Sequence, residues 1–160
     1  MWDADSYTKQ FYAEPWNPLM IDWVQEYSNG TYYHYAEPRH STEAITSKAE
    51  EMMTQHAAEF GKKPLFLYVA YTAAHSPLQP LERHLNQCLH ITHLWRRQFC
   101  GMVVGVDEGM KNLTRTAIET LGKDTIFVVT SDNGGSPWWG GMSQPYRGGK
   151  LLIRELFMLF

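Results

Sequence analysis

The chain has 160 residues, which is enough for one domain with a hydrophobic core and too few for two comfortable ones. Its net charge is −3 at pH 7 and 19% of its residues are charged, so the composition gives no electrostatic reason to expect binding to nucleic acid or to an anionic membrane. No stretch approaches the length of a membrane span, and the first residues have neither the basic start nor the long apolar run of a signal peptide.

The first 40 residues are rich in Trp, Tyr, Pro and Asn and show no clean period. We therefore expect an irregular, aromatic-rich segment that belongs to the same domain as the rest. Ser41-Thr42-Glu43 then offers a polar cap followed by an early acid, which predicts a helix start. The helix should run to about Phe60, with Gly61 at the C-cap position. Its apolar and half-polar positions recur at helical spacing: Ile45, Ala49, Met52, Met53 and His56.

A helix lies between two apolar runs of strand length in the second half of the chain. Residues 65–71 and 125–130 are continuous apolar runs, which suit strands that are buried on both faces of a parallel sheet. Between them, apolar residues recur at three- and four-residue steps and predict a long helix that Gly122 ends: Phe99, Met102, Val103, Val106, Met110, Leu113, Ala117 and Leu121. A strand, a crossover helix and a parallel strand form a right-handed unit in nearly all cases. The fold class predicted is α/β, with a mostly parallel sheet and crossover helices.

Polar residues follow both predicted strands. His75 lies just beyond the first, and Asp132 and Asn133 lie just beyond the second, before Gly134 and Gly135. Because ligand sites in such sheets lie beyond the carboxyl ends of the strands, these side chains should share one edge. A carboxylate and an amide oxygen suit a hard cation such as Ca²⁺, and a loop histidine can protonate a leaving alcohol. Taken alone, each motif is more often an ordinary turn or a solvated loop residue.

Other positions carry weaker signals. Lys150 ends a glycine-rich basic loop that suits an anion such as sulfate or phosphate. Asn29 and Asn112 begin Asn-x-Thr sequences that fit the N-glycosylation pattern. Trp138 and Trp139 belong to a residue type that lines carbohydrate-facing surfaces in some proteins and is plain packing in more.

The ordered set of motifs resembles the type I sulfatases, and it is nearest to the arylsulfatase B group. Residues 63–79 look like the strand-and-loop segment of animal arylsulfatases, and residues 101–114 resemble the helix that follows. Residues 131–135 resemble the metal-site turn of the family, and residues 145–150 resemble its sulfate-side lysine loop. The resemblance covers roughly residues 30–150.

This resemblance implies a partial alkaline-phosphatase-like or sulfatase-like fold and the hydrolysis of sulfate esters, with sulfated glycans as the expected substrates. It implies Asp132 and Asn133 as ligands of one Ca²⁺, with His75 and Lys150 as catalytic groups that contact the sulfate and the leaving-group oxygen. It also implies a lysosomal or secreted glycoprotein, in agreement with the two glycosylation sequences.

The departures from the family pattern concern the nucleophile. The family makes formylglycine from the Cys of a Cys-x-Pro-x-Arg motif, with the help of a formylglycine-generating enzyme, and neither Cys88 nor Cys100 fits that motif. These two thiols could pair, stay free, or bond to cysteines elsewhere. The acidic pair that completes the family's metal site is also absent. We expect residues 1–40 and 41–150 to be parts of one partial catalytic domain, and residues 151–160 to be an atypical tail.

Three hypotheses follow. The first is an internal fragment of a sulfatase that lacks the nucleophile segment and is inactive alone. The second is a short sulfatase-like chain that binds or regulates without turnover. The third, a phosphoesterase of the same superfamily, predicts a Ser or Thr nucleophile and two metal ions, and neither is visible in the sequence.

Overall fold

The computed structural model describes residues 23–26, 29–35, 39–145 and 148–150. Its elements, in chain order, are β1 (Trp23–Glu26), β2 (Tyr32–Tyr35), α2 (Ser41–Phe60), α3 (Glu82–Leu85), η1 (Asn86–Cys88), α4 (Leu94–Thr120) and η2 (Pro137–Trp139). Strands β1 and β2 pair as an antiparallel hairpin, with Trp23 opposite Tyr35. Among the helices described, none combines the length and the apolar character that a bilayer span requires.

Helix α2 has the bounds that the sequence predicts. The ring of His40 accepts a hydrogen bond from the amide of Thr42 at 3.3 Å, which caps the first turn. Because that interaction uses Nδ1 as the acceptor, Nε2 carries the proton and donates to the carbonyl oxygen of Gln79 at 2.9 Å. The helix ends at Gly61, whose φ of 60° is a conformation that glycine adopts without steric cost.

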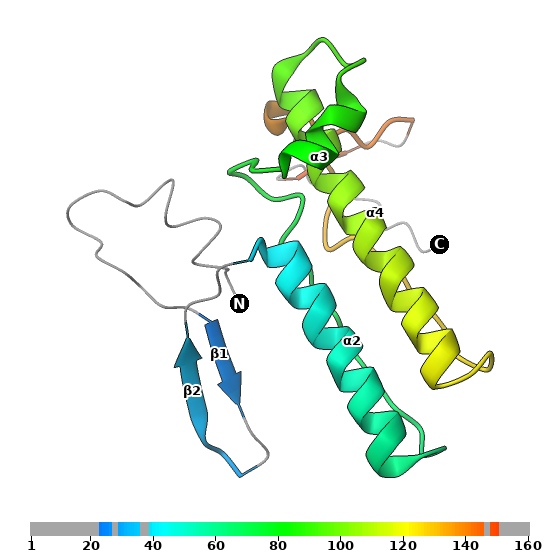
Figure 1. Cartoon of the computed structure of the whole chain (residues 1–160). Helices are drawn as coiled ribbons and strands as arrows, with labels where there is room; N and C mark the ends of the chain where they lie inside the picture. The colour runs from blue at the N-terminus through cyan, green and yellow to red at the C-terminus, as the bar shows by residue number, and fades with distance from the viewer. Residues whose placement is uncertain (1–22, 27–28, 36–38, 146–147, 151–160) are drawn as a thin grey trace.

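Helices α2 and α4 run side by side in the same direction and form one layer of the molecule (Figure 1). Small residues let them approach closely. A Cβ at Gly109 of α4 would lie 2.6 Å from Thr46 Oγ1 of α2 and 2.7 Å from the hydroxyl oxygen of Tyr71. Those two oxygens are themselves 2.8 Å apart and share a hydrogen bond. Gly109 is therefore the point where the two helices and the extended segment after α2 meet.

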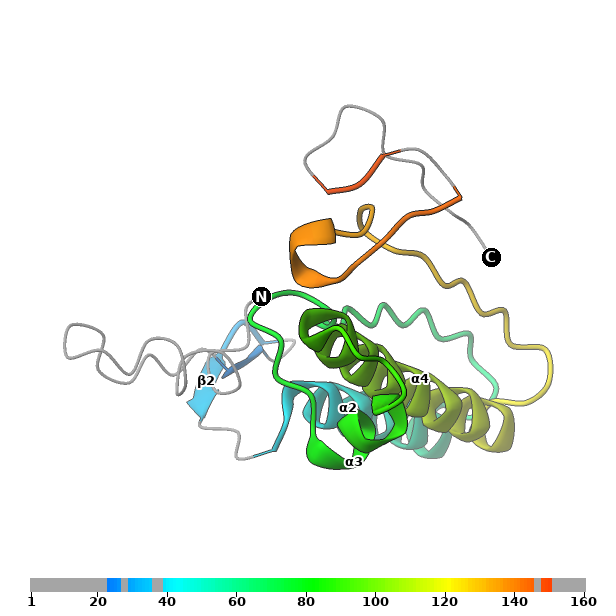
Figure 2. The same cartoon turned by 90° about the horizontal axis from the view of Figure 1, so that it is seen from above.

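The segments predicted as buried parallel strands run extended but are not buried on both faces. Each returns along the helix layer in the opposite direction to the helix before it, so both have their carboxyl ends at the same end of the layer (Figures 1 and 2). Exposure alternates along them: Phe66 is 90% exposed and Tyr68 80%, while Leu65, Leu67 and Val69 are half-buried. In the second segment Ile126 is 88% exposed and Val128 71%.

The prediction of a parallel sheet is therefore not met within the described residues, where the β1–β2 hairpin is the one sheet. The physical reason is that a strand becomes buried on both faces only when neighbouring strands and a second helix layer cover it. Among the described residues, the helices pack against one side of each segment, and the side chains on the other side are exposed. The continuous apolar runs predicted extended segments at these positions, and a run of this kind does not identify the neighbouring strands.

Cys88 and Cys100 form a disulfide that ties η1 to the first turns of α4. Cys88 is fully buried. The structure thus answers a question that the sequence left open, since pairing within the chain was one of three possibilities. Helix α4 also begins earlier than predicted, at Leu94, because the side chain of His93 accepts a hydrogen bond from the amide of Arg96 and caps it.

Candidate functional site

The turn at residues 131–135 leaves the second extended segment at its carboxyl end, as predicted. The hydroxyl of Ser131 donates a hydrogen bond to the carbonyl oxygen of Asn133 at 2.7 Å and tightens the turn. The side chain of Asp132 is exposed and that of Asn133 is half-buried. The two side chains that the sequence predicts as metal ligands are thus neighbours on an ordered, accessible turn.

The lysine loop lies directly on this turn. The amide of Lys150 donates a hydrogen bond to the carbonyl oxygen of Gly135 at 3.1 Å. A Cβ at Gly149 would lie 2.7 Å from that same oxygen, and a Cβ at Gly134 would lie 2.9 Å from the Cα of Gly149. Only glycine fits such a backbone approach. Two segments that the sequence singled out separately therefore form one cluster.

His75 belongs to a different loop, at the same end of the molecule. Its amide donates to the carbonyl oxygen of Thr72 at 3.0 Å, and its Nδ1 lies 2.6 Å from the carbonyl oxygen of Ser76. Because a carbonyl oxygen can only accept, Nδ1 is the donor in that short contact. The hydroxyl of Thr72 donates to Ser41 at 3.4 Å, so the loop is anchored at the start of α2. The loop of residues 72–77 and the 131–135 turn follow the two extended segments at their shared end (Figure 2).

The donor set on the turn has the right chemistry for a hard cation and an incomplete number of ligands. Asp132 and Asn133 offer oxygen atoms, whereas Ca²⁺ takes roughly six to eight. In the residues that the structure describes, no three His, Cys, Asp or Glu side chains are grouped to hold a metal ion. The described residues could therefore supply part of a Ca²⁺ site and would need further ligands to complete it.

The two glycosylation sequences differ in accessibility. Asn29 is exposed in the turn between β1 and β2, where its side-chain oxygen accepts hydrogen bonds from the amide and the hydroxyl of Thr31 at 3.0 and 2.7 Å. Asn112 is half-buried on α4 and receives a hydrogen bond from Arg115 at 3.3 Å. Asn29 is the better placed of the two to carry a glycan.

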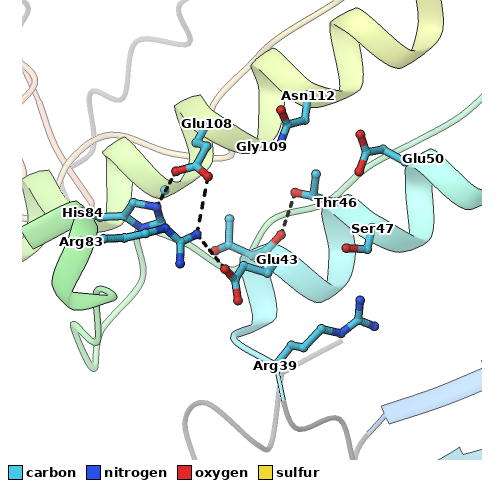
Figure 3. A pocket seen from close by; sticks show the side chains of 12 residues that line it. Arg39, Glu43, Thr46, Ser47, Glu50, Arg83, His84, Glu108, Gly109 and Asn112 are labelled. Carbon is cyan, nitrogen blue, oxygen red and sulfur yellow. Dashed lines mark hydrogen bonds and ion pairs between the residues drawn. The ribbon is translucent and has the colours of Figure 1, made fainter.

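A polar pocket of about 280 Å³ lies between α2, α3 and α4, and sequence reasoning missed it. Figure 3 shows the charged network at its edge. His84, which is buried, lies 2.8 Å from a carboxylate oxygen of Glu108. Arg83 donates to Glu43 at 2.6 Å and lies 3.5 Å from the other oxygen of Glu108. The pocket is not lined by His75, Asp132, Asn133 or Lys150.

The electrostatics of this network explain the pKa shifts. The hydrogen bond from His84 lowers the pKa of Glu108, partial burial opposes that shift, and the charge of Arg83 supports it. The pKa of Arg83 is raised, first by its hydrogen bond to Glu43. Burial raises the pKa of Tyr71, and the charge of Glu50 adds to the shift. Because Arg83 of α3 pairs with Glu43 of α2 and with Glu108 of α4, we interpret the network as a tie that holds α3 to the helix pair.

The sequence carried one signal for this tie. Gly101, Gly105 and Gly109 recur at four-residue steps along α4, which predicts a helix face that neighbours approach closely. A Cβ at Gly105 would lie 2.9 Å from Nδ1 of His84, and one at Gly101 would lie 2.8 Å from Cβ of Pro80. The segment that carries His84 therefore packs directly against the face of α4 that Gly101 and Gly105 form.

Three comparisons with known proteins point to one family for the chain. The sulfatase family model matches residues 2–150. Arylsulfatase J of Mus musculus is 37% identical over 127 residues, which cover 78% of this chain and 19% of that protein. The crystal structure of Ps i-CgsB superposes with a TM-score of 0.69 at 30% identity, over 73% of this chain and 26% of that one. A crystal structure of Ps i-CgsB in complex with k-i-k-neocarrahexaose gives the same values. The chain therefore spans about a fifth of the length of the curated relative.

Proposed function

Since this chain belongs to the sulfatase family, we propose that it supplies one side of the active site of a sulfuric ester hydrolase that acts on sulfated glycans. The observation that carries the proposal is the contact between the 131–135 turn and the lysine loop, made by the amide of Lys150 and the carbonyl oxygen of Gly135. A metal-ligating turn and a cation held side by side suit a sulfate group. The k-i-k-neocarrahexaose bound to Ps i-CgsB supports an oligosaccharide substrate.

The proposal gives a role to four of the described residues. Asp132 and Asn133 would ligate one Ca²⁺, which would supply positive charge beside the sulfate when it is bound. The ammonium group of Lys150 contacts a sulfate oxygen. As the nucleophile supplied from outside this chain bonds to sulfur and the bond between sulfur and the bridging oxygen breaks, His75 donates a proton to that oxygen, so that the sugar leaves as an alcohol. Residues 41–150 are the part of the catalytic domain that holds these groups.

The nucleophile comes from outside this chain in the proposal. Cys88 and Cys100 are the two cysteines of the chain and are joined to one another, so neither is a free thiol. The formylglycine of a complete protein would be made by a formylglycine-generating enzyme from a Cys-x-Pro-x-Arg motif elsewhere. The disulfide also supports a secreted or lysosomal protein, because such bonds persist in oxidising compartments. The exposed sequon at Asn29 supports the same route.

The same disulfide favours a second candidate function, because it uses both cysteines and leaves no thiol in this chain that could become formylglycine. If the natural product is this chain alone, it has no formylglycine precursor, and the turn and lysine loop would serve a sulfatase-like binding or regulatory protein that does not turn over substrate.

The experiment that tests the proposed function replaces His75 by Ala in the natural protein that contains this chain. The steady-state hydrolysis of a sulfated oligosaccharide should slow by roughly 10²-fold or more, because a general acid contributes about that factor. His90→Ala is the matched control, since His90 is an exposed loop histidine outside the cluster and its loss should leave the rate unchanged. An unchanged rate in the His75→Ala protein would remove the proton-donor role.

A further inference from the structure

We propose that Trp138 is a stacking surface for the sugar ring next to the sulfated one, an inference that rests on the function proposed above. Trp138 is the middle residue of η2 and is 86% exposed. Single exposed apolar residues are common on protein surfaces and need no special explanation. What sets Trp138 apart is its position beside the turn and the lysine loop, on a backbone that is held from several sides.

The first step concerns position. Helix η2 begins at Pro137, two residues after the 131–135 turn ends. A Cβ at Gly149 would lie 3.8 Å from Cδ of Pro137 as well as 2.7 Å from the carbonyl oxygen of Gly135. Gly149 precedes Lys150, so η2 starts in contact with both parts of the proposed sulfate site. Trp138 is thus one residue away from that contact.

The second step concerns rigidity. The amide of Gly141 donates to the carbonyl oxygen of Ser136 at 2.9 Å, which closes the loop around η2. Arg96 of α4 donates to the carbonyl oxygen of Gly140 at 2.6 Å. The amide of Gly135 donates to the hydroxyl of Ser143 at 3.0 Å, which ties the far side of the loop back to the turn. A platform for a ligand binds better when it is already ordered, because less conformational entropy is lost.

The third step separates the two neighbouring tryptophans. The ring of Trp139 meets the ring of Trp95 edge to face, with centroids 5.2 Å apart and an interplanar angle of 87°. Trp139 therefore has a packing role that fastens η2 to α4. In a 3₁₀ turn, successive side chains point about a third of a turn apart. Trp138 consequently leaves the surface on which Trp139 packs and presents its ring to solvent.

The fourth step concerns the ligand. An indole ring offers a flat apolar face and a polar N–H at its edge. A pyranose ring is complementary to it, since its C–H groups can lie on the face while its hydroxyl groups stay hydrated. When the sulfated sugar is held at Lys150, the next sugar ring of the oligosaccharide would lie on the indole face of Trp138. The subsite would therefore distinguish an oligosaccharide from a monosaccharide sulfate.

The test compares Trp138→Ala with Trp138→Phe in the natural protein that contains this chain. Met142→Ala is the matched control, because Met142 is exposed on the same loop and has no assigned role. The probes are a sulfated tetrasaccharide and the corresponding monosaccharide sulfate. Binding is measured by fluorescence titration, and kcat and KM are measured separately.

Trp138→Ala should weaken tetrasaccharide binding and raise its KM by roughly 3- to 10-fold, from the strength of aromatic stacking. It should leave kcat and both monosaccharide constants unchanged, and Trp138→Phe should restore much of the affinity. Equal tetrasaccharide affinity in wild type and Trp138→Ala would overturn the proposal, and so would a Trp138 that the intact protein covers against acrylamide quenching. A protein that binds the tetrasaccharide through Trp138 but hydrolyses neither probe would instead contradict the proposed function alone.

Discussion

The amide of Lys150 and the carbonyl oxygen of Gly135 are joined by a hydrogen bond of 3.1 Å. Gly135 and Lys150 are 15 positions apart in the sequence. The turn and the lysine loop nevertheless meet there with almost no space between their backbones, since a Cβ at Gly149 would lie 2.7 Å from the same oxygen. The geometry explains why glycines occupy both sides of the contact. It also makes the contact sensitive to a single methyl group.

Gly149→Ala should therefore separate the lysine loop from the turn. The added methyl group cannot fit against the carbonyl oxygen of Gly135, so Lys150 should move relative to Asp132. In the natural protein we expect a fall in kcat/KM for sulfate esters that exceeds any loss of folded protein, because the added methyl group displaces Lys150 directly. Ser143→Gly, which removes one hydrogen bond from the same loop, provides a milder comparison. Full activity in Gly149→Ala would show that the contact is not needed.

Gly109→Ala should destabilise the helix layer. Its Cβ would lie 2.6 Å from Thr46 Oγ1 and 2.7 Å from the hydroxyl oxygen of Tyr71, which are partners in a hydrogen bond. Overpacking of this kind costs about 1–3 kcal/mol. Urea unfolding should show a lower midpoint for Gly109→Ala, whereas Lys111→Ala, at an exposed position on the same helix, should unfold near the wild-type midpoint. Equal midpoints for all three would contradict the close packing described for α2 and α4.

Loss of the disulfide should lower stability independently of the site. The bond between Cys88 and Cys100 joins residues separated by 12 positions. A loop of about that size contributes roughly 2–4 kcal/mol by restricting the unfolded chain. The Cys88→Ala, Cys100→Ala double variant should melt at a lower temperature than the oxidised protein. Alkylation of the denatured, unreduced protein should label neither cysteine, and labelling of both would show that the bond is absent.

The pairing of Glu108 with His84 and Arg83 predicts an acid-dependent loss of stability. The pKa of Glu108 is lowered from its usual 4.5 in the folded state, first by the hydrogen bond from His84. A carboxylate with a lowered pKa stabilises the fold above its unfolded pKa, and this contribution is lost as the pH falls through the lowered value. At pH values under about 4.5, the melting temperature should therefore decrease as the pH is lowered further.

Glu108→Gln tests that assignment. The variant should melt below wild type at neutral pH, and the two curves should converge as the pH falls toward 3. Glu119→Gln, at an exposed position on the same helix, should keep the full pH dependence of wild type. A constant difference between wild type and Glu108→Gln at every pH would mean that Glu108 does not titrate as its contacts indicate.

The sequence predicted the helices well because their signals are local. Ser41 to Glu43 and Gly61 mark the ends of α2 within the segment itself. The family order of motifs also led us to expect the segments of Asp132 and Lys150 together, and the hydrogen bond between Lys150 and Gly135 joins the two segments. The parallel sheet could not be settled in the same way, because its strands must pair with one another, and the described residues provide no strand partner for the segments that carry Phe66 and Ile126.

The charged network was missed for a different reason. His84 and Glu108 are 24 positions apart and meet only because Gly105 lets the segment of α3 lie against α4. Read alone, Glu108 is one acidic residue on the solvent side of a helix. Interactions between distant residues of this kind follow from the packing and not from any local pattern.

The measurement that tests the central claim most directly is the mass and peptide map of the natural protein in its source tissue. The account predicts a product much larger than 18.5 kDa that includes the peptides of this chain, with Cys88 linked to Cys100, and a separate Cys-x-Pro-x-Arg peptide converted to formylglycine. A product of about 18.5 kDa plus glycans that begins at Met1 would contradict the enzyme claim and leave the fold resemblance alone standing.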